Sequence, residues 1–132
     1  MIHITNRFLL VDDDPLNNLI SKMVLKKSMD APEVIAFTIP ENGLEYIQSE
    51  FASGHADEKT TLLHDINMPS MTGWEFLEKF DNFPYELKEQ FNIYILSSSI
   101  DPADIQCAKQ NSLIIDFIEK PLDNTKLINM FG

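Results

Sequence analysis

The sequence predicts an α/β fold: a doubly wound, five-stranded parallel sheet flanked by helices on both faces. Three observations lead to this prediction. Short apolar runs alternate with longer amphipathic segments along the 132 residues. Two of the runs, Phe8–Val11 and Asn92–Leu96, are apolar nearly throughout, which is typical of parallel strands covered on both faces. No internal repeat or low-complexity tract interrupts the pattern, so we expect one domain over residues 1–132.

The first strand and the first helix have the clearest signals. Arg7–Val11 is predicted as a strand and Leu16–Ser28 as a helix. Asp14 suits the N-cap position, and Pro15 suits the first helical position, where an N–H would lack a partner. The apolar residues that recur at helical spacing are Leu16, Leu19, Ile20, Met23 and Val24.

The remaining elements repeat this alternation. A strand at Glu33–Thr38 leads to a helix at Glu41–Phe51, whose apolar stripe is less regular. The segment Gly54–Lys59, GHADEK, reads as an exposed loop. Gly73 permits a tight backbone at the start of the third helix. The other predicted strands are Thr61–His64, Asn92–Leu96 and Leu113–Ile118, and the other predicted helices are Gly73–Phe80, Ala103–Lys109 and Asn124–Met130.

Composition excludes several classes of function. With 21 acidic and 10 basic residues the net charge is −11, which argues against binding nucleic acid through its phosphates and favours cations or basic protein surfaces. No apolar run approaches the roughly 18 residues of a membrane span, and the N-terminus MIHITNRFLL lacks a signal peptide's basic start. We therefore expect a cytoplasmic protein. Cys107 is the single cysteine, and we expect it to pack in a helix.

Polar residues follow the predicted strands directly. The first strand ends at Asp12–Asp14, the third at Asp65, the fourth at Ser97 and Ser98, and the fifth at Glu119–Pro121. Parallel strands bring their carboxyl ends to one edge of the sheet, where ligands bind at the point at which the strand order reverses. We therefore expect the functional site at this edge.

The acidic residues at this edge indicate a metal. Asp14 is explained as a helix cap. Carboxylates at Asp12, Asp13 and Asp65 would repel one another, which raises their pKa values unless a cation lies among them. Mg²⁺ prefers oxygen ligands and is commonly held by one or two carboxylates together with a phosphate. The sequence therefore predicts a Mg²⁺ site.

Four segments carry a resemblance to a known family. LLVDDDP, HDINMPSMTG, YILSSS and FIEKP, in this order and spacing, resemble the receiver domain of two-component response regulators. The resemblance covers nearly the whole chain, and four segments at four strand ends are far more specific than any one alone. It implies a flavodoxin-like fold and a phosphorelay signalling domain that assists its own phosphorylation and dephosphorylation, rather than an enzyme.

The resemblance also implies the roles of the acidic residues. Asp65 matches the phosphoacceptor, which would become an acyl phosphate. Asp12 and Asp13 match the acidic pair that binds Mg²⁺, with Asp13 as the direct ligand. Asn67 matches the position whose backbone carbonyl completes the metal shell. Phosphoryl transfer depends mainly on positioning and electrostatics, so no general base is needed.

Further positions follow from the same resemblance. Ser97, followed by the small Ser98, matches a hydroxyl that bonds the phosphoryl group, and Lys120 matches a lysine joined by a cis peptide to the following proline. Phe117 matches an aromatic switch position. Phosphate on Asp65 would draw the Ser97 hydroxyl toward it, and the Phe117 ring would turn into the vacated space, changing the nearby surface.

The partners that the resemblance implies are proteins. The donor would be a phosphohistidine on a sensor histidine kinase or a histidine phosphotransfer protein, and the output a downstream protein effector. Homodimerisation is left open, and neither a nucleic acid nor a membrane is expected. No output domain lies within the 132 residues, and the last predicted helix is shorter than that of the family.

Several neighbouring residues have a plainer explanation. His64 is interpreted as a partly buried packing residue that points to the face opposite Asp65, not as a phosphodonor. Met68, Met71 and Trp74 form either a partner-recognition surface or the packing of the loop and the helix start.

Two other functional classes are alternatives to a receiver domain. A phosphohydrolase of the haloacid dehalogenase type also uses an aspartate, Mg²⁺ and a lysine, and Asp12 would be its nucleophile. Asp12 and Asp14 have the DxD spacing of that family, but Pro15 departs from its pattern. A non-phosphorylated interaction module would be expected to lack a site residue, and none is missing.

Overall fold

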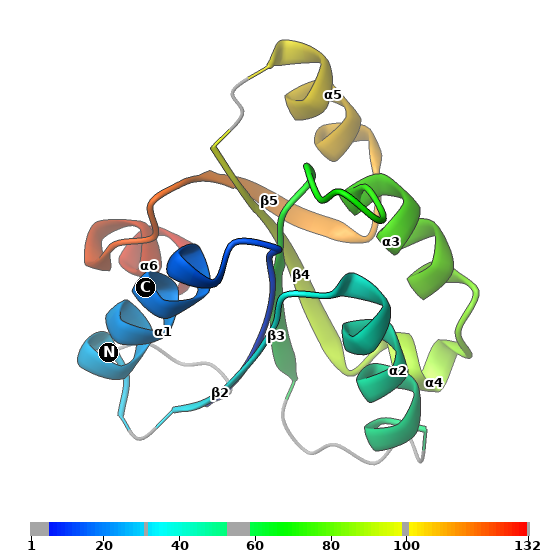
Figure 1. Cartoon of the computed structure of the whole chain (residues 1–132), viewed down its shortest axis with the longest axis horizontal. Coiled ribbons are helices and arrows are strands. Elements are labelled where there is room, and N and C mark those ends of the chain that lie inside the picture. The colour runs from blue at the N-terminus through cyan, green and yellow to red at the C-terminus, as the bar shows by residue number, and fades with distance from the viewer. Residues whose placement is uncertain (1–5, 31, 53–58, 99–100, 132) are drawn as a thin grey trace.

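Five parallel strands form one sheet in the order β2-β1-β3-β4-β5 (Figure 1). The structure, a computed structural model, describes residues 6–30, 32–52, 59–98 and 101–131. The chain crosses from β1 to β2 on one side and then returns to β3 on the other, so the strand order reverses between β1 and β3. The predicted doubly wound sheet is confirmed. Its strands are β1 (Arg7–Val11), β2 (Glu33–Phe37), β3 (Thr60–His64), β4 (Phe91–Ser97) and β5 (Ile114–Glu119).

Helices cover both faces of this sheet, with α1 and α6 on one face and α2, α3 and α5 on the other (Figure 1). The five predicted helices are confirmed, with ends that differ from the prediction by one residue or none. The four-residue helix α4 was not predicted, because a single turn is too short to show a periodic pattern. The helices are α1 (Pro15–Ser28), α2 (Pro40–Glu50), α3 (Gly73–Asp81), α4 (Tyr85–Lys88), α5 (Pro102–Gln110) and α6 (Asn124–Phe131).

The core lies in two layers, one on each face of the sheet. Successive side chains of a strand point to opposite faces, so Leu9 belongs to the cluster under α2 and α3, whereas Leu10 belongs to the cluster under α1 and α6. Leu62 and Leu63 of β3 divide in the same way. Burial on both faces explains why these central strands are apolar at nearly every position.

Helix α1 is confirmed, but its apolar stripe does not face the core. Its buried residues are Asn18, Ser21 and Leu25. Asn18 Nδ2 donates to the carbonyl oxygens of Asp12 at 3.0 Å and of Phe37 at 3.3 Å, and these bonds fix which side of the helix faces the sheet. The stripe is exposed, at 59% for Leu16, 53% for Leu19, 36% for Ile20 and 62% for Met23, and Val24 alone of it packs partly against the core.

Other sequence expectations have mixed outcomes. Met68 and Met71 are buried in the core, which supports loop packing over a partner surface. Cys107 is exposed, so the prediction that it packs in a helix is wrong; α5 packs through Ala108 instead.

Residues 54–58 of the predicted loop and the first five residues lie outside the described residues. Within the described ranges, no helix combines the length and apolar character needed to cross a bilayer.

Candidate phosphoacceptor and metal site

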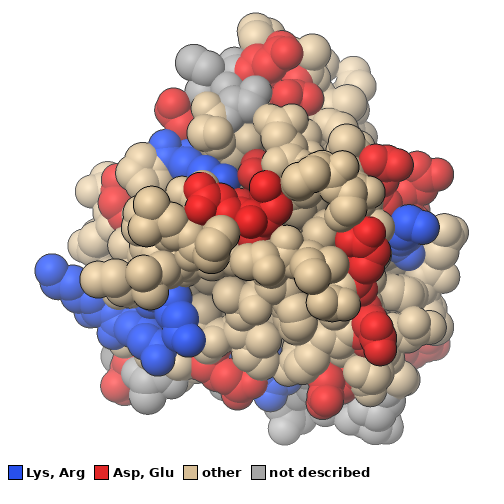
Figure 2. Space-filling model, in the orientation of Figure 1, with Lys and Arg blue, Asp and Glu red and all other residues tan. Residues whose placement is uncertain are grey.

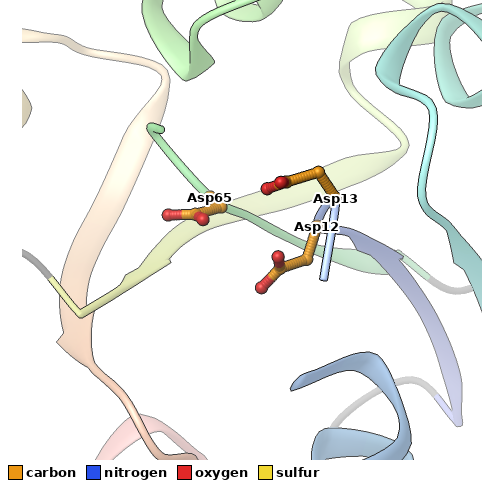
Figure 3. Close-up of side chains that lie close together, drawn as sticks. All are labelled: Asp12, Asp13 and Asp65. Atoms are coloured by element: carbon orange, nitrogen blue, oxygen red, sulfur yellow. The ribbon is translucent and has the colours of Figure 1, made fainter. Parts of the chain in front are cut away.

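Three carboxylates meet at the carboxyl ends of β1 and β3. One oxygen from each of Asp12, Asp13 and Asp65 lies within 4.8 Å of the other two. Figure 3 shows the three side chains pointing into one space from the two strand ends. The backbone pairing continues into the site, because Asp65 N donates to Val11 O at 3.0 Å. The strand order therefore produces the acidic cluster that the sequence predicted.

Lys120 brings a positive charge to this cluster from the end of β5. Its Nζ lies 2.6 Å from Asp12 Oδ2 and 3.2 Å from Asp65 Oδ2. Lys120 N donates to Ser97 O at 2.9 Å, which ties the loop after β5 to β4, and the Lys120–Pro121 peptide is cis. Figure 2 shows acidic side chains gathered near the middle of this face, with basic atoms beside them.

Burial and charge act in opposite directions on this ion pair. Burial raises the pKa of Asp12, although the hydrogen bond from Lys120 and that from Asp14 N at 2.9 Å act to lower it. Burial acts to lower the pKa of Lys120, but Asp12 and Asp65 outweigh that effect, and the pKa of Lys120 is raised. The ammonium form is therefore strongly held, while the Asp12 carboxylate is less favourable than in water.

The two oxygens of Asp65 have different partners. Ile66 N donates to Oδ1 at 2.7 Å, while Oδ2 accepts from Lys120. Asp65 is buried, with 7% of its surface accessible. Its carboxylate is thus held in one orientation at the floor of the site.

Asp14 and Asn18 both form hydrogen bonds with Asp12. Asp14 is confirmed as the N-cap of α1, since its Oδ1 accepts from Leu16 N at 3.0 Å. Asn18, which no sequence motif indicated, is buried, and its Nδ2 donates to the carbonyl oxygen of Asp12. Its burial could have been inferred from helical spacing, because Asn18, Ser21 and Leu25 lie on the same side of the helix.

The other predicted site residues lie at the same edge or beside it. Ser97 is fully buried at the end of β4, and Ser98 is exposed after it. Asn67 is exposed two residues after Asp65, and its role as a carbonyl ligand stays a prediction. Phe117 is partly buried against a small cluster of Ile66, Ile95 and Ala108, and its role as a switch also stays a prediction.

His64 is a packing residue, as predicted, but it is fully rather than partly buried. Its ring stacks on Phe76 of α3, with the ring centroids 5.3 Å apart and the planes at 27°. Burial lowers the pKa of His64 to about 4, although the backbone of Asp65 opposes this shift. The imidazole is therefore neutral near pH 7.

The donor set of the site fits Mg²⁺. All three clustered groups are carboxylates, and Asp13 is less buried than the other two, which leaves the site open to water on one side. A cation would also relieve the repulsion among the three acids. Lys120 beside them could neutralise a further anionic oxygen. Chemically, the arrangement places the Asp65 carboxylate, held in one orientation, beside the ammonium group of Lys120.

Comparison with known proteins gives one consistent result. The sequence matches the model of the response regulator receiver domain over residues 8–131. A two-component response regulator from Cytophaga hutchinsonii has a TM-score of 0.85 at 26% identity, covering 97% of this chain and 95% of that one. A response regulator receiver protein from Dyadobacter fermentans has a TM-score of 0.82 at 27% identity, covering 94% and 93%. No curated protein sequence is significantly similar.

Proposed function

The chain belongs to the response regulator receiver family, and from this premise we propose that Asp65 is the residue that accepts the phosphoryl group. Receiver domains of two-component systems are phosphorylated on an aspartate, and the chain is a signalling domain rather than an enzyme in the usual sense. The single observation that carries the proposal is the position of Lys120, whose ammonium contacts Oδ2 of both Asp65 and Asp12.

In the proposed reaction, a carboxylate oxygen of Asp65 forms a bond to the phosphorus of a donor phosphohistidine. The P–N bond breaks, the imidazole leaves with the electron pair, and Asp65 carries an acyl phosphate. A carboxylate has no proton to lose, so no general base is required. Lys120 stabilises negative charge on a phosphoryl oxygen, and the Ile66 N–H holds Oδ1 of Asp65 during attack.

Asp12, Asp13 and Asp65 are the residues that would hold Mg²⁺, and the Asn67 carbonyl is the proposed fourth ligand from the protein. This proposed metal site is supported by the three carboxylate oxygens, one from each aspartate, that lie within 4.8 Å of one another. When bound, the ion supplies positive charge that offsets charge on the transferring phosphoryl group. Lys120 already contacts two of these three acids, so the lysine and an ion compete for the same carboxylate charge.

The proposed output is a change in the surface near α5 and β5. Ser97 would bond the phosphoryl group through its hydroxyl, and Phe117 would turn in response. The buried position of Ser97 at the end of β4 supports this proposal, as does the packing of Phe117 against Ile95 on the neighbouring strand. Phenylalanine has no hydroxyl, so the switch depends on the shape of the ring alone.

The phosphodonor is proposed to dock on the exposed apolar face of α1, formed by Leu16, Leu19, Ile20 and Met23. This helix begins two residues after Asp13, so its face adjoins the rim of the site. The helix contains three lysines and no acidic residue, in a chain of net charge −11. A donor with an apolar and acidic surface would therefore be complementary to it.

The alternative of a haloacid-dehalogenase-like phosphohydrolase is not supported, since the family match is to receivers. Asp14, which would be the second acid of its DxD motif, is exposed and caps α1. A single receiver domain acting through protein contacts, a downstream protein effector, possible homodimerisation and a cytoplasmic location stay our predictions for this chain.

The proposal is tested by incubating the protein with acetyl phosphate and Mg²⁺ and measuring the intact mass. We expect wild type to gain the mass of one phosphoryl group, and Asp65→Asn to gain none. Asp116→Asn, on the exposed part of β5, is a matched control that should behave like wild type. A mass gain that persists in Asp65→Asn would remove Asp65 from the proposed role.

A further inference from the structure

His64 and the Asp65 carboxylate hold opposite ends of one peptide group. The His64 Nδ1 lies 3.1 Å from the carbonyl oxygen of Asp65. The N–H of the same peptide group, that of Ile66, donates to Asp65 Oδ1 at 2.7 Å. When Nδ1 carries the ring proton, the imidazole donates to the peptide oxygen while the peptide N–H donates to the carboxylate. This tautomer gives the buried ring N–H an acceptor.

The surroundings keep the His64 ring in this position. It is 1% exposed and stacks on Phe76 of α3. Gly73 leaves room for the contact, because a Cβ there would lie 2.4 Å from the Asp65 carbonyl oxygen and 3.1 Å from His64 Nδ1. Gly73 N also donates to Ile66 O at 2.7 Å, which fixes the next peptide along the chain.

Packing alone does not account for a histidine here. The ring lies in an apolar layer, and its Nε2 is buried without a hydrogen-bond partner among the described residues. A buried polar atom without a partner is unfavourable, and an aliphatic side chain of similar size would avoid it. The histidine instead contributes a donor aimed at the backbone of Asp65.

We propose that His64 is a positioning residue for the phosphoacceptor. By holding the Asp65–Ile66 peptide, it fixes the N–H that holds Oδ1 of Asp65, and it thereby directs Oδ2 toward Lys120 and the incoming phosphorus. A hydrogen bond to the peptide oxygen also strengthens the N–H of the same peptide as a donor. This inference rests on the proposed function of Asp65.

Two substitutions separate positioning from packing. His64→Leu fills the space without a donor, whereas the side-chain amide of His64→Asn can place an N–H near the position of Nδ1 but leaves a gap. At saturating Mg²⁺ we expect acetyl phosphate to phosphorylate His64→Leu about fivefold more slowly than wild type, the effect of one ordinary hydrogen bond. His64→Asn should react nearly as fast as wild type, although it should be the less stable variant in urea.

Equal rates in both variants and wild type, or rates that follow the order of stability, would overturn the inference. A second readout needs no phosphoryl donor: the amide proton shift of Ile66 in NMR spectra. It should move upfield in His64→Leu and stay near the wild-type value in His64→Asn. An unchanged shift in His64→Leu would overturn the inference, whereas a wild type that takes up no phosphoryl group would instead overturn the proposed function.

Discussion

The ammonium group of Lys120 lies 2.6 Å from Oδ2 of Asp12, so a buried ion pair joins the end of β5 to the end of β1. Their side chains are only 9% and 8% exposed. The same ammonium contacts Asp65 at 3.2 Å. Lys120 therefore supplies positive charge to the acidic cluster, and in the function proposed above it also stabilises negative charge on a phosphoryl oxygen.

Lys120→Met keeps the length of the side chain and removes its charge. We expect it to lower the free energy of unfolding in EDTA by about 3 kcal/mol, because it leaves Asp12 buried without its partner. We expect tighter Mg²⁺ binding, because no ammonium competes for the carboxylates. Urea unfolding with and without Mg²⁺ measures both effects. If Mg²⁺ stabilised this variant and wild type equally, the proposed competition would be wrong.

Asp13→Asn and Asp14→Asn remove the same charge from adjacent residues. Asp13→Asn should weaken Mg²⁺ binding by about tenfold, because a carboxylate ligand is lost. Asp14→Asn should weaken it by only about twofold, because an exposed charge is screened, and asparagine still caps α1. Isothermal titration calorimetry measures both affinities, and similar losses in the two variants would contradict the assignment of Asp13 as a ligand.

Asn18→Ala should lower the free energy of unfolding by about 2 kcal/mol, because it leaves the carbonyl oxygens of Asp12 and Phe37 without this donor. Asn17→Ala is the matched control. Its amide makes only an exposed bond to Asp14 at 3.3 Å, so its effect should stay within about 0.5 kcal/mol. Urea unfolding of both variants tests this, and equal effects would show that Asn18 does not anchor α1.

His64 should make stability depend on pH. Its pKa in the folded protein is lowered from 6.5 to about 4, so the unfolded chain binds more protons between these values. The contribution of His64 to the free energy of unfolding is therefore fully present above pH 6.5, and it is lost as the pH falls toward 4. Between pH 7 and pH 4, the stability of wild type relative to His64→Leu should fall by about 3 kcal/mol. A pH-independent difference in urea unfolding would contradict the buried neutral ring.

The α1 face should matter for a protein donor and not for a small one. For this test we use a histidine kinase that phosphorylates wild type. Leu19→Ser and Met23→Ser should each slow phosphoryl transfer from this kinase about fivefold or more, because apolar contacts are lost. Their reaction with acetyl phosphate should be unchanged. Ile115→Ser on β5, where the side chain is 55% exposed, is the control on a different surface. Equal slowing by all three would argue against docking on α1.

The sheet and the acidic cluster could be predicted because their signals are local, whereas the predicted roles of Ser97, Lys120 and Phe117 depended on the family resemblance. Apolar runs mark the strands, and once β1 and β3 are neighbours in the strand order, parallel pairing brings Asp12 and Asp65 together. The rotation of α1 could not be predicted in this way. Its apolar stripe suggested a core face, but Asn18 faces the sheet because two backbone carbonyl oxygens there accept its amide.

The contact of His64 was also beyond the sequence. Alternation along β3 indicates which face its side chain occupies, but not that Nδ1 reaches the Asp65 carbonyl oxygen. That contact depends on the close approach of Gly73, which only the folded chain shows. The prediction that Cys107 is a packing residue was wrong for a related reason. Helix α5 packs through Ala108, so most of its other residues stay accessible.

The residue that carries the phosphoryl group can be identified directly. After reaction with acetyl phosphate and Mg²⁺, borohydride reduces an aspartyl phosphate to homoserine, and peptide mass spectrometry identifies the position. We expect homoserine at position 65 and nowhere else. Modification at Asp12 or Asp13, with position 65 unchanged, would contradict the proposal that Asp65 accepts the phosphoryl group.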